Sequence, residues 1–325
     1  MDGRQPAAGA GACVRDAALA VSCTACVAAC PVAALAFGDE GDLDIDAAAC
    51  TGCGACAAAC PTGALALDGA VPVPRAQPGR DGTVLVLCPR RGGSLCLHAL
   101  GLEALADIWL RGGRRLAMAI GDCNTCPNRM PQGFARALTD LDALLADRGL
   151  PPMTRDTASA RDLRTHEPLG AGTPDLHRRA LFRAALPDPE EPALARLQRA
   201  GRPGPATRFA HVASFDADRC TGCDACIRIC PASALSDVNA VTGETAYNCV
   251  SSSCVGCGLC VDVCDSDAIA IPRMSSAPPA LPLVAFRCRG CGVKCRVPAQ
   301  RGPGDGLCPI CTRAGHFRLL HQVLS

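Results

Sequence analysis

The sequence is poor in aromatic residues, which make up 3% of its 325 residues, with one tryptophan and one tyrosine. No part of it can therefore be built around the large aromatic side chains that dominate many hydrophobic cores. An excess of charge of one sign is also missing, because 32 basic residues are balanced by 31 acidic ones. This balance excludes a nucleic-acid coat, which needs a cationic excess. No eighteen apolar residues follow one another without interruption, so no membrane span is predicted.

Signals for secretion and for catalysis are absent as well. Residues 1–15 are rich in glycine and alanine and lack the charged start and apolar core of a secretory signal. The chain has no P-loop, no strand-borne G-x-G-x-x-G and no nucleophile elbow. We therefore expect a cytoplasmic protein that is not an enzyme, with no catalytic residues, no organic cofactor and no small-molecule substrate.

Cysteine is what the chain has in excess, with 26 residues. Disulfides are one interpretation, but they belong to oxidising compartments and mostly to short secreted chains. The spacing of the cysteines instead indicates thiolates bound to metal.

The cysteines recur in a repeated motif. Three runs follow the pattern C-x2-C-x2-C-x3-C, at residues 50–60, 220–230 and 254–264. A fourth copy ends in Cys23, Cys26 and Cys30, but its first cysteine is displaced: Ala20 occupies the regular position, and Cys13 lies further upstream. Proline follows the last cysteine of each copy except the third, where Asp265 stands. We expect a short helical turn leading to a strand after each fourth cysteine.

These runs resemble bacterial-type ferredoxin domains with two [4Fe-4S] clusters, duplicated as in polyferredoxins and in the electron-transfer subunits of oxidoreductases. In that family, three cysteines of a run hold one cluster and the fourth holds the other. The resemblance therefore implies four [4Fe-4S] clusters, with structural zinc on the same thiolates as the alternative. The implied ligand sets are Cys13, Cys23, Cys26 and Cys60; Cys50, Cys53, Cys56 and Cys30; Cys220, Cys223, Cys226 and Cys264; and Cys254, Cys257, Cys260 and Cys230.

Two departures from the family pattern matter. If Cys13 is not a ligand, its site has an open iron or holds a three-iron cluster, but a loop insertion is tolerated more cheaply than an unligated iron. Asp265 restores a backbone N–H beside a cluster thiolate and adds a carboxylate. These two changes shift the reduction potential in opposite directions.

A different segment separates the two pairs of runs. Residues 83–87 and 116–120 have the apolar character of buried strands, with helices predicted over 97–110 and 134–148. Parallel strands joined by a crossover helix end at the same sheet edge, where four cysteines should meet: Cys88, Cys96, Cys123 and Cys126. We expect a fifth iron–sulfur cluster there, with metal-free thiols or zinc as alternatives. The arrangement is loosely similar to thioredoxin-like ferredoxins and to small hydrogenase-associated iron–sulfur subunits.

The C-terminal segment carries two further C-x2-C knuckles, formed by Cys288, Cys291, Cys308 and Cys311. They are flanked by the β-prone residues 283–286 and 317–320, which is typical of a zinc ribbon. One zinc is predicted, with a rubredoxin-type iron on the same ligands as the alternative. Cys249 and Cys295 then remain unassigned, both beside metal motifs.

The predicted fold class is α+β, in five parts: a first two-cluster ferredoxin domain (1–75), a β-α-β domain with four cysteines (80–150), a Pro/Arg-rich linker with short helices (151–212), a second two-cluster ferredoxin domain (213–275) and a zinc-ribbon-like module (280–325). We expect an electron-transfer protein that relays single electrons to or from a partner oxidoreductase. An accessory ferredoxin-type protein that assists the maturation of a metalloenzyme is the alternative.

Overall fold

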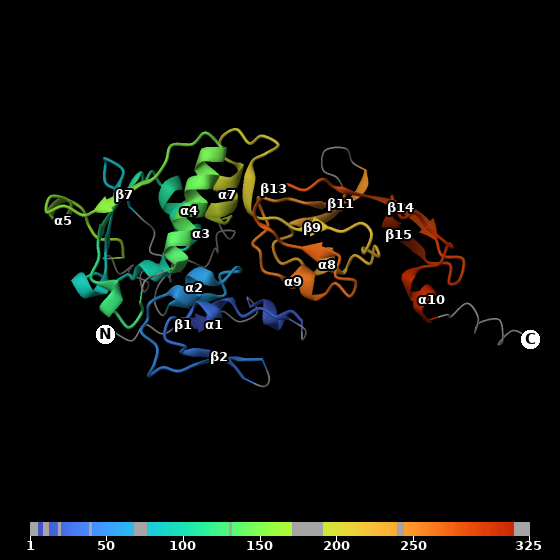
Figure 1. Cartoon of the computed structure of the whole chain (residues 1–325), viewed down its shortest axis with the longest axis horizontal. Coiled ribbons are helices and arrows are strands. Elements are labelled where there is room, and N and C mark those ends of the chain that lie inside the picture. Colours follow the sequence, from blue (N-terminus) through green and yellow to red (C-terminus); the bar gives the residue numbers. More distant parts are fainter. Residues whose placement is uncertain are drawn as a thin grey trace, which may run out of the picture. The chain divides into compact units, whose positions relative to one another are not determined.

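A computed structural model of the chain mixes helices and strands, in agreement with the α+β prediction (Figure 1). The described residues are 6–8, 13–18, 21–38, 41–67, 77–129, 132–170, 191–238 and 244–314. The chain divides into two compact units, of which unit 1 comprises residues 1–18 and 23–208, and unit 2 comprises residues 19–22 and 209–325. Among the described residues, no helix has the length and apolar character needed to span a membrane.

The N-terminal part of unit 1 is built from short elements: β1 (Pro6–Ala8), η1 (Val14–Asp16), α1 (Ala25–Ala29), β2 (Leu35–Phe37), β3 (Leu43–Ile45), α2 (Ala55–Ala59) and β4 (Leu65–Leu67). The helices α1 and α2 lie side by side (Figure 1). β1 pairs with β4 and β2 pairs with β3, both antiparallel. The core between them contains Leu35, Leu65 and cysteine side chains in place of large apolar residues.

The helical turns lie before the fourth cysteine of each run, so the prediction that they follow it is wrong. α1 and α2 each contain the third cysteine of a run and end at the fourth, at Cys30 and Cys60. The residues that follow form a tight turn and then a strand, β2 or β4. Proline contributes in three of the four copies, because it removes a backbone donor and disfavours helical backbone at the residue before it. The helix before Cys264 also ends ahead of this cysteine although Asp265 follows it, so proline is not required.

The central part of unit 1 is a three-stranded parallel sheet of order β5-β6-β7 with its connecting helices. Its elements are β5 (Thr83–Leu87), η2 (Pro89–Arg91), η3 (Leu97–Ala99), α3 (Leu102–Leu110), β6 (Arg115–Ala119), η4 (Cys123–Thr125), α4 (Gln132–Asp147), β7 (Thr154–Thr157), α5 (Asp162–Thr165) and α7 (Ala193–Arg199). The strand expected at 83–87 is present, and the second strand begins one residue earlier than expected. The helix expected over 97–110 is divided by Gly101 into η3 and α3. Fully buried leucines of α3 and α4 form the core against this sheet.

The predicted linker over 151–212 is partly built into this sheet. β7 pairs in parallel with β6, and Leu169 donates a backbone hydrogen bond of 2.8 Å to Leu85 of β5. α7 packs against α3, and the Glu103 carboxylate accepts the backbone N–H groups of Ala193 and Leu194 at 2.6 and 3.0 Å. These segments therefore belong to the central domain, while residues 171–190 lie outside the described residues.

Unit 2 begins with a second set of short elements around two helices. They are β8 (Arg208–His211), β9 (Ser214–Phe215), α8 (Ala225–Ile229), β10 (Leu235–Val238), β11 (Thr245–Cys249), α9 (Leu259–Asp262), β12 (Ile269–Ala270) and β13 (Arg273–Ser276). The helices α8 and α9 are in contact, as α1 and α2 are in unit 1. The core combines Leu235, Ile269 and Ala213 with cysteine side chains.

The C-terminal part adds β14 (Leu281–Arg287), β15 (Lys294–Pro298) and α10 (Pro309–Ala314). β14 pairs with both β11 and β15, which gives a four-stranded sheet of order β10-β11-β14-β15. The strand expected at 283–286 lies within β14, and the strand expected at 317–320 falls outside the described residues. The sheet is thus continuous from the second ferredoxin-like region to the C-terminal knuckles.

Candidate functional site

The fourth cysteine of every run lies in the same local structure, which we call the cysteine turn. Three residues after this cysteine the backbone is left-handed, with φ between 46° and 66°. The next residue is a buried alanine whose backbone N–H donates to the cysteine sulfur at 3.2–3.3 Å. The four sulfur–alanine pairs are Cys30 with Ala34, Cys60 with Ala64, Cys230 with Ala234, and Cys264 with Ala268.

The cysteine turn prepares a thiolate for a cluster, because an N–H···S hydrogen bond stabilises negative charge on the sulfur. The copy that begins at Cys264 has the same turn although Asp265 replaces proline. The cysteine spacing alone does not predict this turn, but the sequence carries a signal for it, an alanine four residues after each fourth cysteine.

In unit 2, thiols of the two runs lie close to one another. Burial, followed by the charges of neighbouring thiols, raises the pKa of Cys226 to about 12. These neighbours include Cys220 and Cys223 of its own run and Cys264 of the other run. Burial raises the pKa of Cys260 in the same way, and the thiols that act on it are Cys254 and Cys257 of its own run, followed by Cys226 and Cys230 of the other run. Because these thiols disfavour one another's ionisation, four thiolates at either position need a positively charged metal core between them.

The two predicted sets described above lie in unit 2. A third predicted set, whose four cysteines also lie close together, is in unit 1. Burial raises the pKa of Cys56 to about 12, and the charges acting on it are those of Cys53, Cys30 and Cys50. Burial also raises the pKa of Cys26, where the acting charges include Cys23 and Cys60. The structure therefore brings together Cys23, Cys26 and Cys60, which are the members of the fourth predicted set other than Cys13.

Cys13 lies immediately before η1 and is partly buried. Arg15 of η1 donates from Nε to the backbone oxygen of Cys23 at 2.8 Å, which ties this segment to the loop that carries Cys23. The segment of the displaced cysteine is thus held near its run by the Arg15 side chain, and the role of Cys13 as a ligand stays a prediction.

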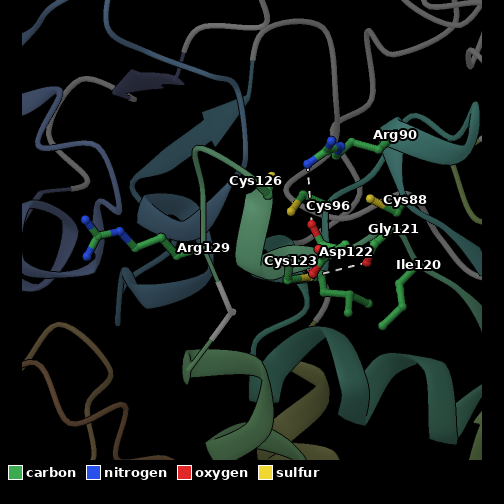
Figure 2. Close-up of a pocket in the computed structure, with 10 residues that line it drawn as sticks. Cys88, Arg90, Cys96, Ile120, Gly121, Asp122, Cys123, Cys126 and Arg129 are labelled. Carbon is green, nitrogen blue, oxygen red and sulfur yellow. Dashed lines mark hydrogen bonds between the residues drawn. The ribbon is translucent and has the colours of Figure 1, made fainter.

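The central cysteines lie around one open pocket at the edge of the parallel sheet (Figure 2). β5 and β6 pair in parallel with Leu87 opposite Ala119, so the two strands end together. The pocket is lined by Cys88, Cys96, Cys123 and Cys126, together with Arg90, Leu97, Ile120, Gly121, Asp122 and Arg129. The structure therefore places all four predicted cysteines at one site.

The C-terminal knuckles form the tightest thiol group. The sulfurs of Cys288, Cys291, Cys308 and Cys311 all lie within 4.8 Å of one another. Backbone N–H groups of Cys291 and Cys308 lower the pKa of the Cys288 thiol to about 6, while burial raises the pKa of Cys311. Cys291 Sγ and Cys308 Sγ are 3.8 Å apart. A tetrahedron with Zn–S bonds of about 2.3 Å has edges of about 3.8 Å, so the donor set fits zinc.

The two cysteines left unassigned by the sequence lie beside these groups. Cys249 is buried, accepts the backbone N–H of Ala213 at 3.4 Å and shares a hydrogen bond with the Cys254 thiol. Cys295 is partly buried against the knuckle cysteines.

Comparison with protein families agrees with the two ferredoxin-like regions. Residues 21–64 and residues 216–269 each match a family model described as a 4Fe-4S dicluster domain. The first match begins after Cys13. No curated protein matches the chain. The protein thus carries a duplicated ferredoxin-type domain, which is typical of iron–sulfur electron transfer.

Proposed function

We propose that this protein relays single electrons through four [4Fe-4S] clusters, two in each dicluster domain, to or from a partner oxidoreductase. The repeated cysteine turn is the observation that carries the proposal, because all four copies keep the same N–H···S bond. When bound, each cluster supplies a centre that gains or loses one electron.

The chain's own residues suit this task. The third cysteine of each run is buried in a helix beside small side chains, so backbone amides can approach a cluster and water is kept from it. A buried, preformed thiol cage changes little when one electron is added, and this supports rapid transfer. We assign the interleaved ligand sets named above to the four clusters, with Cys13 completing the set of Cys23, Cys26 and Cys60.

For the C-terminal knuckles we propose one zinc with a structural role. The sulfur separations fit a single tetrahedral ion, and Cys295 is left outside the set. A rubredoxin-type iron would use the same thiols and is distinguished by its colour and by elemental analysis.

The partner in this proposal is a separate redox enzyme, since the sequence offers no catalytic motif of its own. We place the protein in the cytoplasm, where 26 cysteines remain reduced and available to metal.

Anaerobic purification, elemental analysis and a reductive titration followed by electron paramagnetic resonance test this function. We expect at least about sixteen irons and one zinc per chain, with rapid reoxidation by an added electron acceptor. An iron content near four would contradict the four-cluster assignment. Binding to an apo-enzyme without electron passage would support the accessory role instead.

A further inference from the structure

The central pocket lies directly against the first dicluster domain, within unit 1. η3 begins after Cys96 and packs on α2, which begins shortly after Cys53. The loop after Cys50 and the loop after Cys126 are joined by a hydrogen bond of 2.6 Å from Thr51 Oγ1 to Asn128 Oδ1. His98 Nε2 also lies 2.8 Å from the backbone oxygen of Asn128. Cysteine-bearing loops of both sites therefore meet in one hydrogen-bonded contact.

The backbones at this contact are as close as glycine allows. A Cβ atom on Gly101, which separates η3 from α3, would lie 2.8 Å from the backbone oxygen of Ala58 in α2. Any larger residue at this position would push the central domain away from α2. The close approach accounts for a glycine whose φ of −76° requires none.

The spacing of the central thiols differs from that of the C-terminal knuckles. The donor atoms of the four knuckle cysteines all lie within 4.8 Å of one another. Among the described residues, no three of the central cysteines meet this criterion. The four central cysteines line one pocket but stand farther apart. A multi-iron core, being several atoms wide, suits this wider spacing better than a single zinc ion.

We infer that Cys88, Cys96, Cys123 and Cys126 hold an iron–sulfur cluster that exchanges electrons with the cluster of Cys53 through this contact. The inference rests on the proposed function of the dicluster domains. One electron passes from one cluster to the other, so that the first is oxidised and the second reduced, with no bond formed or broken. The pocket is open, and its rim residues Arg90, Asp122 and Ile120 are exposed, so a partner protein can approach the central cluster. The pocket is thus the point where electrons enter or leave unit 1.

The test compares the full-length protein with its Cys123→Ser variant. Cys123 lies on the β6 side of the pocket, outside the hydrogen bonds that join the pocket to α2, and Cys295→Ser is the matched control. We expect Cys123→Ser to lose the iron of one cluster, about two to four atoms per chain, and Cys295→Ser to lose none. In the fully reduced protein, spin–spin broadening of the electron paramagnetic resonance signal should exceed that caused by the paired clusters of the dicluster domains, and this excess should disappear in Cys123→Ser.

Three results would overturn the inference. These are equal iron contents in all proteins, loss of zinc rather than iron in Cys123→Ser, and loss of iron with unchanged line shape of the remaining clusters. If Cys123→Ser does not fold, Cys126→Ser is measured in its place, and Mössbauer spectroscopy of the unaltered protein counts the clusters directly. Iron near sixteen in all proteins refutes the central cluster alone, whereas an iron-free preparation refutes the proposed function itself.

Discussion

Removing the metal from the C-terminal knuckles should unfold them while leaving the sheet beside them intact. The buried cluster here consists of Cys288, Cys308, Cys311 and one leucine, Leu307. Full burial of a leucine contributes about 1.5–3 kcal/mol, whereas a structural zinc ion contributes about 10–16 kcal/mol to the folding of a small domain. The proposed zinc ion would therefore dominate the stability of this segment.

The neighbouring strands have support of their own. β14 pairs with β11, and Arg296 of β15 forms ion pairs with Asp224, at 2.6 Å, and with Asp237. We therefore expect the unfolding to stop at β15. Residues 299–311 should lose their protection from hydrogen exchange, and residues 281–287 should retain it.

The Cys311→Ser variant removes one of the four sulfurs. Its zinc content is measured, and its hydrogen–deuterium exchange is followed by mass spectrometry. Zinc should fall from about one per chain to none, because three thiolates hold the ion less tightly than four. Cys295→Ser is the matched control and should keep both zinc and protection, since Cys295 is outside the four-sulfur group. A zinc-free variant whose residues 299–311 remain protected would show that this segment does not depend on zinc for its folding.

Three further substitutions test unit 2. Cys249→Ala removes the hydrogen bond shared with Cys254, worth about 1 kcal/mol, and should lower the potential of that cluster by about 40 mV in a redox titration. Gly222→Ala places a Cβ 2.0 Å from a backbone oxygen of β15 at a φ of 72°, so cluster iron should fall in elemental analysis. Tyr247→Phe removes the buried hydroxyl that donates to Asp224 Oδ1 at 2.5 Å, and should lower the free energy of unfolding by about 1.5–3 kcal/mol in denaturant titration.

Each of these predictions has a defined failure. Gly258→Ala is the control for Gly222→Ala, because its φ is 82° but no atom lies within 4 Å of the added Cβ. Equal iron in both variants would show that backbone conformation matters there rather than the close approach. An unchanged potential in Cys249→Ala would mean that this thiol does not influence the cluster. An unchanged free energy of unfolding in Tyr247→Phe would show that the hydrogen bond to Asp224 does not stabilise unit 2.

The two ferredoxin-type domains could be predicted from sequence because a cluster fixes cysteine spacing over a few residues. The convergence of Cys88 and Cys123 was also predictable, since the apolar pattern gave two strands and a crossover helix brings their ends to one edge. The position of the short helices was not, because the cysteine spacing is the same whether a turn precedes or follows the fourth cysteine.

β7 was missed for a different reason. Thr154, Arg155, Asp156 and Thr157 are all exposed, so the strand has no alternation of apolar and polar residues from which to predict it. Its pairing with β6 depends on contacts made far along the chain. The contact between Thr51 and Asn128 likewise joins residues 77 positions apart and leaves no local pattern.

β7 also bears on aggregation in a protein so rich in cysteine. It ends the parallel sheet, where exposed backbone groups could recruit a strand of another molecule. Arg155 is held there by Asp142 at 2.8 Å, and Asp156 by Arg115 at 2.9 Å. Burying these paired charges between two molecules is unfavourable. The exposed polar residues of β7, which give no strand pattern in the sequence, therefore also protect the sheet from aggregation.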